Sequence, residues 1–338
     1  MRVKSSIRNY RVFFKECFDR SLIDIYNEGD IIIVDSLVSN LYDLPTGHRY
    51  IEIEASEKAK SFEYLPSVLD SILLAGFNRE NKIIAVGGGV IQDISSFISS
   101  ILFRGVNWVF FPTTLLAQSD SCIGGKTSIN YRKYKNQLGS FNPPSEVIIC
   151  HSFLSTLVDI DIKSGLGEML HFFLVSGKED LEMYRENYKN NIPKLTKRCL
   201  EIKKWFIEKD EFDTSERLLL NYGHTFGHAI ENITNYKYPH GISVCMGMDI
   251  ANFISMRKGY LSLERYLELK ELTSDVHGCI IKKNDIDNFI SALEKDKKNN
   301  KSGFINCVLT SGPGSMFLEN IDKYTIKECL EEYYCGLD

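Results

Sequence analysis

Two histidines in the segment NYGHTFGHAIE (221–231) have the spacing of residues that share one face of a helix. His224 and His228 lie four residues apart, and a glutamate follows three residues later. Histidines with this spacing bind zinc in HExxH metalloproteases, but Thr, Phe and Gly stand between them here, so the protease base is missing. Three interpretations are open: a metal site, a proton-transfer pair, or satisfied polar residues in a domain interface.

Two residues elsewhere in the chain favour the metal site. His240 lies in PHG, after a loop and before another helix, and Glu168 lies in SGLGEMLHF, a helix that otherwise shows an apolar stripe. One carboxylate and two imidazoles form an open zinc site, with coordination positions left for a substrate. Whether these residues converge depends on the fold.

Two glycine-rich segments could approach phosphate. In KIIAVGGGVIQD (82–93) a strand runs into glycines and then into a helix, an arrangement in which backbone amides and the helix N-terminus attract phosphate oxygens. A plain strand-to-helix turn is the alternative, because the full GxGxxG is absent. IGGKTS (123–128) is not a P-loop, because Asp120 occupies the first glycine position of GxxxxGK[ST].

The first half of the chain alternates short apolar runs with helical patterns. The runs are continuous, as in strands buried on both faces of a parallel sheet. We predict strands at 30–35, 50–55, 82–89, 107–114 and 146–150, with helical patterns at 58–76 and 91–105. This βαβα order predicts an α/β, Rossmann-like nucleotide-binding domain over residues 1–158.

The second half shows long helical periodicities instead. They cover 161–176, 180–210, 216–233 and 242–259, and one late strand-like run, GFINCVLT, occupies 303–310. We therefore predict a mostly α-helical domain over residues 159–338 that holds the metal and the substrate.

Composition excludes several classes of protein. The 338 residues are 43% hydrophobic and 25% charged with a net charge of −5, which suits a soluble globular protein and argues against nucleic-acid binding. No run reaches the ~18 apolar residues of a membrane helix, and the N-terminus lacks the apolar region of a signal peptide. Nine scattered cysteines without CxxC predict reduced thiols, so we expect a cytoplasmic protein.

Several ordered motifs together resemble the 3-dehydroquinate synthase family of sugar-phosphate cyclases over nearly the full length. The motifs are GGGVIQD, FRGVNWVFFPTTLLAQSDSCIGGKTSIN, KNQLGSFNPP, GLGEML, R..LLNYGHTFGHAIE and HG..V..GM. The resemblance implies an NAD-binding N-terminal domain and a helical C-terminal domain with a divalent metal, zinc first and cobalt second. It also implies a sugar phosphate as the substrate.

The resemblance assigns roles to individual residues. It implies that the metal ligands are Glu168, His224 and His240. The residues implied for NAD are Asp35, Glu57, Lys60, Gly88, Gly89, Val90, Asp93, Thr113, Thr114, Asp120, Ser121, Lys135 and Thr156. The residues implied for substrate and catalysis are Lys126, Asn136, Lys203, Arg217, Asn221 and His228, with Lys135 at substrate or cofactor. His171 is a further catalytic candidate, because it stands three residues after Glu168 on the same helical face.

The resemblance also implies assembly and closure of the site. Arg104 matches an arginine that reaches the neighbouring subunit's site, so a homodimer is expected. Either Lys297 or Lys298 closes over the phosphate.

The family's reaction explains why such residues are needed. A secondary alcohol is oxidised by NAD, phosphate leaves by β-elimination, the hydride returns, and the opened ring closes by an aldol step. A metal polarises the alcohol and ketone. Charge-assisted hydrogen bonds from Lys126, Asn136, Asn221 and His228 would orient the phosphate, whose own oxygen can take the proton. Arg217, a planar fork, and Lys203 suit a carboxylate on the substrate.

Three positions depart from the family pattern. His171 stands where a lysine is usual, three residues after Glu168, and replaces a fixed cation by a group that titrates near pH ~6.5. Ile242 and Asp213 each replace a usual glutamate. We hypothesise that His171 changes the preferred sugar; pairing of His171 with Glu168 on the metal is a further possibility.

The leading hypothesis is a 3-dehydroquinate synthase that acts on 3-deoxy-arabino-heptulosonate 7-phosphate, and three competing functions are open. A sister cyclase of secondary or surface-sugar metabolism would act on another heptulose or hexose phosphate. A metal-dependent alcohol dehydrogenase would release NADH during turnover. A catalytically dead scaffold is disfavoured by the intact ligand set.

Overall fold

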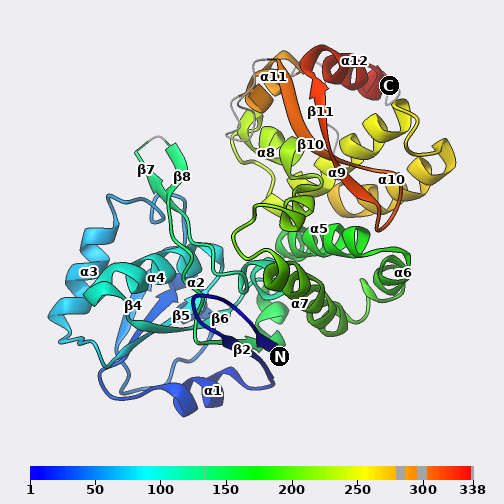
Figure 1. Ribbon diagram of the computed structural model, residues 1–338. Coiled ribbons are helices and arrows are strands. Elements are labelled where there is room, and N and C mark those ends of the chain that lie inside the picture. Colours follow the sequence, from blue (N-terminus) through cyan, green and yellow to red (C-terminus); the bar gives the residue numbers. More distant parts are fainter. Residues whose placement is uncertain (133, 279–285, 295–302, 336–338) are drawn as a thin grey trace. The chain divides into compact units, whose positions relative to one another are not determined.

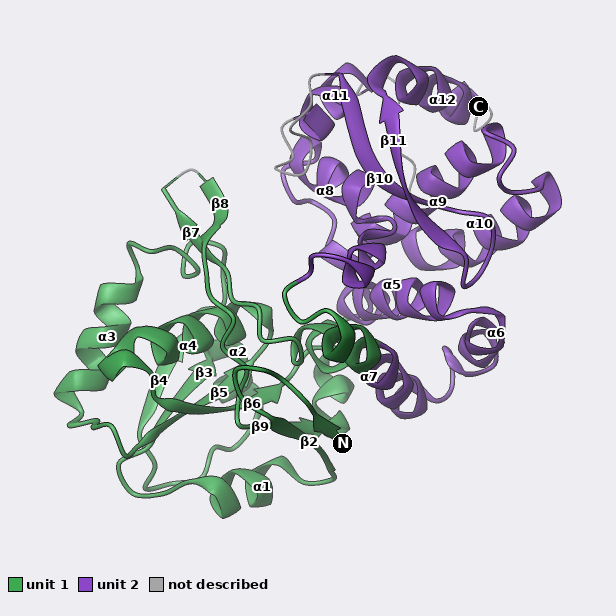
Figure 2. Ribbon diagram, in the orientation of Figure 1, with its two compact units in different colours: residues 1–158, 203–212 green, residues 159–202, 213–338 purple. Residues whose placement is uncertain are grey.

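The chain forms two compact units. The computed structural model describes residues 1–132, 134–278, 286–294 and 303–335. Unit 1 comprises Met1–Val158 with Lys203–Phe212, and unit 2 comprises Asp159–Ile202 with Asp213–Asp338 (Figure 2). The predicted second region, 159–338, is therefore not one continuous unit, because residues 203–212 group with the first.

Unit 1 is built on a seven-stranded sheet (Figure 1). Its strand order is β1-β2-β9-β6-β5-β3-β4, and every neighbouring pair is parallel except β1 and β2. The strands are β1 (Arg2–Val3), β2 (Tyr10–Lys15), β3 (Ile31–Asp35), β4 (Tyr50–Ile53), β5 (Lys82–Gly87), β6 (Asn107–Pro112) and β9 (Glu146–Cys150). The predicted parallel α/β fold is confirmed, whereas β1 and β2 were not predicted.

Central strands of this sheet are buried along most of their length, as continuous apolar runs require. Ile32, Val34, Ile84, Val86 and Phe111 join one apolar cluster with residues of the covering segments. The helices of unit 1 are α1 (Phe18–Ile25), α2 (Ser36–Leu41), α3 (Leu65–Leu74) and α4 (Gly89–Ile101), with short turns η1 (Leu102–Arg104), η2 (Ala117–Ser121) and η3 (His151–Thr156). A hairpin of β7 (Ile129–Tyr131) and β8 (Tyr134–Leu138) was not predicted.

The direction of strand addition reverses between β3 and β5. After β3 the chain adds β4 on one side, and then returns to add β5, β6 and β9 on the other. Ligands of open α/β sheets bind outside the carboxyl ends of the strands at such a reversal. Asp35 ends β3, and Gly88 follows β5, so both lie at this point.

Unit 2 is mainly helical. Its helices are α5 (Asp159–Ser176), α6 (Lys178–Asn187), the first part of α7 (Ile192–Lys209), η4 (Glu216–Asn221), α8 (His224–Ile233), α9 (His240–Arg257), α10 (Leu263–His277), α11 (Ile286–Glu294) and α12 (Lys323–Cys335). The predicted strand at 303–310 is β10 (Phe304–Thr310), paired with β11 (Met316–Asp322). Within the described residues, no helix combines the length and apolarity needed to cross a bilayer.

Glycines let three helices of unit 2 approach closely. Helix α9 packs against both α5 and α8 and is buried almost throughout. A Cβ on Gly241 would overlap the Ser164 carbonyl oxygen of α5, and one on Gly247 would overlap the Gly223 carbonyl oxygen before α8. Backbone contact of this kind needs residues without side chains. It brings together the helices that carry Glu168, His224 and His240.

Candidate metal centre and cofactor site

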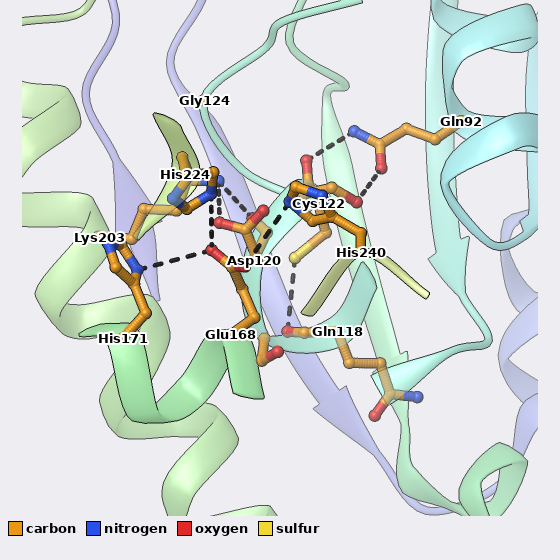
Figure 3. A network of polar contacts seen from close by, with 12 residues as sticks. Gln92, Gln118, Asp120, Cys122, Gly124, Glu168, His171, Lys203, His224 and His240 are labelled. Carbon is orange, nitrogen blue, oxygen red and sulfur yellow. Dashed lines mark hydrogen bonds and ion pairs between the residues drawn. The ribbon is translucent and has the colours of Figure 1, made fainter. Parts of the chain in front are cut away.

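Three side chains from three helices of unit 2 converge. Glu168 of α5, His224 of α8 and His240 of α9 each present one ligand atom, and these atoms all lie within 4.8 Å of one another. Glu168 Oε1 is 3.6 Å from His224 Nε2, and Glu168 Oε2 is 3.8 Å from His240 Nε2 (Figure 3). Both distances exceed hydrogen-bond length.

The geometry of this group fits a divalent metal. Zinc bonds of about 2.0–2.1 Å in a tetrahedral arrangement separate two ligand atoms by roughly 3.4 Å. The observed distances are a few tenths of an ångström longer, a gap that small side-chain rotations close. The Glu168 side chain is only 3% exposed, and a buried carboxylate requires a compensating charge. A cation with three protein ligands keeps open coordination positions.

Each imidazole has a second contact that turns Nε2 toward Glu168. His240 Nδ1 lies 2.9 Å from Glu231 Oε1, and His224 Nδ1 lies 3.3 Å from the Tyr222 carbonyl oxygen. No role was predicted for Glu231 from the sequence, although it closes the motif that contains His224 and His228. It stands seven residues after His224, on the same helical face.

His171 lies against the same carboxylate. Its ring is fully buried, with Nδ1 3.6 Å from Glu168 Oε1 and its centroid 5.0 Å from that of His224. His171 belongs to neither group of described residues whose ligand atoms converge. The possibility that it acts as a metal ligand with Glu168 therefore gains no support from the geometry.

The other predicted substrate residues of unit 2 lie near these ligands in the chain. His228 shares α8 with His224, and its ring centroid is 5.8 Å from that of His240. Arg217 is buried in η4, and Asn221, also in η4, donates from Nδ2 to the Leu218 carbonyl oxygen at 2.8 Å. That these three residues contact the substrate remains a prediction.

The predicted dinucleotide residues of unit 1 line the carboxyl edge of the sheet. Thr113 donates its amide to the Gly87 carbonyl oxygen at 3.0 Å, which joins the end of β6 to that of β5. A Cβ on Gly88 would lie 3.0 Å from Thr114 Cγ2, so glycine permits this approach. The next two residues, Gly89 and Val90, begin α4, whose amides can face phosphate. Asp35 caps α2, and burial raises its pKa.

Two ion pairs join further predicted cofactor residues. Lys60 Nζ is 2.7 Å from Asp93 Oδ2, and Lys135 Nζ is 3.2 Å from Glu57 Oε2. Burial raises the pKa of Asp93, and Lys60 offsets only part of this effect. Burial also acts to raise the pKa of Glu57, but the Asn130 hydrogen bond and the two lysines outweigh it, so the net shift is downward.

A cavity of about 360 Å³ lies beside the hairpin. Its lining includes Lys126, Ser128, Asn136 and Ser140. Two of these, Lys126 and Asn136, are predicted substrate residues, and Asn136 has a positive φ of 52°. Their donors suit an anion such as phosphate.

Lys203 and Asp120 form a pair within unit 1. Lys203 Nζ lies 2.7 Å from both the carbonyl oxygen and Oδ1 of Asp120, and the two side chains are 8% and 21% exposed. Sequence reasoning predicted a substrate role for one and a cofactor role for the other, but not their contact. The pair is one of several contacts between residues 203–212 and the rest of unit 1, together with those of Glu208 and Glu211 to residues 4–6.

Five predicted residues remain, and the structure gives hydrogen-bond partners for Ser121 and Thr156. Ser121 donates to Gln92 Oε1 at 2.6 Å, and Thr156 Oγ1 is 3.0 Å from the Tyr42 hydroxyl. Arg104 is exposed, and both it and Phe103 adopt left-handed φ values of 64° and 49°. Lys297 and Lys298 lie outside the described residues.

A parallel α/β unit of the nucleotide-binding type, combined with a helical unit that carries a carboxylate–histidine group, is typical of metal-dependent enzymes that bind a dinucleotide. Residues 50–164 match the family 3-dehydroquinate synthase N-terminal, and residues 162–299 match 3-dehydroquinate synthase C-terminal. The chain is 36% identical over 342 residues to the 3-dehydroquinate synthase of Helicobacter pylori (strain G27), covering 97% of each sequence. The chain belongs to the 3-dehydroquinate synthase family, and it is an enzyme of that kind, a phosphate-eliminating cyclase.

Two solved structures show the same fold. A 2-deoxy-scyllo-inosose synthase superposes with a TM-score of 0.86 at 24% identity, covering 98% of this chain and 99% of that one. The 2-epi-5-epi-valiolone synthase of Streptomyces hygroscopicus subsp. jinggangensis superposes with a TM-score of 0.85 at 24% identity, covering 97% of each chain. At these identities the likeness establishes the fold alone.

Proposed function

We propose that this enzyme is a 3-dehydroquinate synthase that uses NAD and a divalent metal. Its substrate would be 3-deoxy-arabino-heptulosonate 7-phosphate, which it would convert to 3-dehydroquinate in the shikimate pathway of aromatic amino acid biosynthesis. The observation that carries the proposal is the convergence of Glu168, His224 and His240. A homologue without this chemistry would have no reason to keep a buried carboxylate facing two imidazoles.

The cofactors are inferred from the site chemistry and the relatives. The 2-deoxy-scyllo-inosose synthase structure contains NAD+, Co2+ and a carba-sugar phosphate, and the valiolone synthase structure contains NAD+ and Zn2+. In this chain the strand-order reversal beside Asp35 and Gly88 suits NAD. The carboxylate–histidine group suits zinc, with cobalt as the other candidate.

When bound, the metal would polarise the substrate alcohol, and NAD would supply the transient oxidation. The chain's own residues orient the substrate and carry protons. Lys126 and Asn136, which line the cavity beside the hairpin, are proposed to hold the phosphate. Asn221 and His228 are proposed as further phosphate contacts. Lys203 and Arg217 are proposed to bind the substrate carboxylate. Lys203 would then exchange part of its contact with Asp120 for the substrate.

A second candidate function rests on His171. Its buried ring lies against Glu168 and replaces the reach and charge of the lysine usual in the family. A sister cyclase acting on another heptulose or hexose phosphate would accommodate this change.

The two functions are separated by a phosphate-release assay over C6 and C7 sugar phosphates, with products identified by mass and NMR. Efficient turnover of 3-deoxy-arabino-heptulosonate 7-phosphate would exclude the second function. Otherwise a His171→Lys variant should gain activity on that substrate. Phosphate release without net absorbance change at 340 nm would exclude an alcohol dehydrogenase.

We also infer a cytoplasmic homodimer in which Arg104 contributes to the partner's site. Sedimentation would give the oligomeric state. Mixing an Arg104→Ala chain with a Glu168→Gln chain should restore activity if each site needs both copies. Absence of any restoration in mixed dimers would contradict this role.

A further inference from the structure

The carboxylate of Glu231 belongs to the metal centre without being a metal ligand. We propose that Glu231 is a positioning residue, which holds the His240 ring so that Nε2 faces the cation. This inference rests on the proposed function in one respect, namely that Glu168, His224 and His240 bind a metal.

The two nitrogens of His240 face two different carboxylates. Nδ1 is 2.9 Å from Glu231 Oε1, and Nε2 is 3.8 Å from Glu168 Oε2. The first distance is that of a hydrogen bond and the second is not. A proton on Nδ1, donated to Glu231, leaves the lone pair on Nε2. A carboxylate acceptor also makes the imidazole a stronger ligand.

His240 needs such an orienting contact more than His224 does. The His240 side chain is 36% exposed, whereas that of His224 is 13% exposed. Each histidine is the first residue of its helix, so exposure rather than helix position distinguishes them. Packing therefore restrains the His240 ring less, and a charged hydrogen bond supplies the missing restraint.

Helix α8 is suited to provide this carboxylate. Residues 224, 228 and 231 recur at intervals of four and three, so one helical face carries His224, His228 and Glu231. Glu231 is 14% exposed, so water competes less for its hydrogen bond with His240 than it would at an exposed carboxylate. The contact also fixes the start of α9 to the helix that carries His224. The contact thereby holds His224 and His240, which lie on separate helices, at a fixed separation.

A different use of the same carboxylate is a second cation. His228, Glu231 and His240 form another group whose ligand atoms lie within 4.8 Å of one another. However, the 2.9 Å between His240 Nδ1 and Glu231 Oε1 is shorter than the roughly 3.4 Å that separates two ligands of one tetrahedral zinc. The geometry therefore favours the hydrogen bond over a second metal.

The test compares metal binding in matched variants of the full chain. Native protein, Glu231→Ala, Glu231→Gln and Glu186→Gln are stripped of metal and titrated with Zn2+ or Co2+ against a chromophoric chelator. Glu186 is an exposed glutamate of α6 and provides the same chemical change away from the centre. The Co2+ visible spectrum reports coordination, and thermal unfolding of the metal-free proteins reports stability.

We expect Glu231→Ala to weaken metal binding 10- to 100-fold. Glu231→Gln should lose less, because the amide oxygen still accepts from Nδ1, and Glu186→Gln should match the native protein. Native affinity in both Glu231 variants would overturn the inference and leave the metal centre intact. Two cations per native chain, with the second lost in Glu231→Gln, would overturn it in favour of a second site. Native protein that binds no divalent cation would overturn the inference and the proposed function together.

Discussion

The two units solve the problem of buried charge in different ways. In unit 1 the predicted cofactor and substrate residues neutralise one another, as in the Lys60–Asp93 and Lys203–Asp120 pairs at 2.7 Å. In unit 2 one buried carboxylate is surrounded by imidazole nitrogens at 3.6–3.8 Å, beyond hydrogen-bond length. Charge pairs within the chain balance the first site, whereas the second is the proposed site of a cation.

Because of this difference, removing the metal and removing a charged side chain of unit 1 should have different effects. Loss of the metal should change unit 2 and catalysis, while the charge pairs of unit 1 should persist. Loss of one charge in unit 1 should leave its partner buried and uncompensated, which costs stability even without any ligand.

The largest effect is expected from removal of the metal. Chelation, or the variant Glu168→Gln, should lower kcat/KM by roughly 10³-fold, because a Lewis acid supplies several kcal/mol of transition-state stabilisation. Added Zn2+ or Co2+ should restore the chelated native enzyme, and Glu186→Gln should behave as the native protein. NADH binding by metal-free protein, followed by the fluorescence of the reduced cofactor, should be retained. Full activity in metal-free enzyme would remove the contrast between the units.

The next effect is expected at the buried pair of unit 1. Lys203→Met should lower the free energy of unfolding by about 3–5 kcal/mol, because the Asp120 carboxylate, which is only 21% exposed, loses the buried cation beside it. Lys204→Met is the matched control, since Lys204 pairs with Glu208 at the surface and should cost at most about 1 kcal/mol. Urea unfolding measures both. Adding Asp120→Asn to Lys203→Met should recover part of the loss, and equal losses in the two single variants would refute the comparison.

A smaller effect is expected in the core of unit 2, at Asp249. Burial raises its pKa to about 6 from 3.8, partly offset by the Tyr333 hydroxyl, which donates to Oδ2 at 2.5 Å. The folded state therefore holds the proton more tightly than the unfolded state, and stability should fall as pH rises from about 4 to about 6. The loss should reach about 3 kcal/mol. Thermal unfolding at several pH values should show Asp249→Asn gaining relative to the native protein over this window; a constant difference would contradict the assignment.

The smallest effect is expected at the exposed pair of unit 1. Lys135 and Glu57 are 32% and 55% exposed, so Lys135→Met should change stability by no more than about 1 kcal/mol. Its expected consequence is instead a higher KM for NAD, measured by steady-state kinetics. A stability loss as large as that of Lys203→Met would show that burial does not determine how much stability is lost when such an ion pair is broken.

Local pattern predicted much of the fold. Apolar runs located β3, β5, β6 and β9 because strands buried on both faces cannot tolerate polar residues. Helical periodicity located α5 and α9, but only the structure showed that the glycines beside Glu168 and His240 let these two helices touch. Strand β2, which lies between β1 and β9, was not predicted, because its burial alternates and its parallel partner β9 lies more than a hundred residues away.

The sequence by itself determined the types and spacing of the groups that can do chemistry: Glu168, His224 and His240, and the glycines that follow β5. Residue type and helical period are local properties, so they can be recognised from the sequence without a structure. Only the tertiary structure decided the contacts that join distant segments. It set Glu231 against His240, His171 against Glu168, and Lys203 against Asp120. Such contacts depend on how helices cross and where the chain returns, which packing of the whole chain determines.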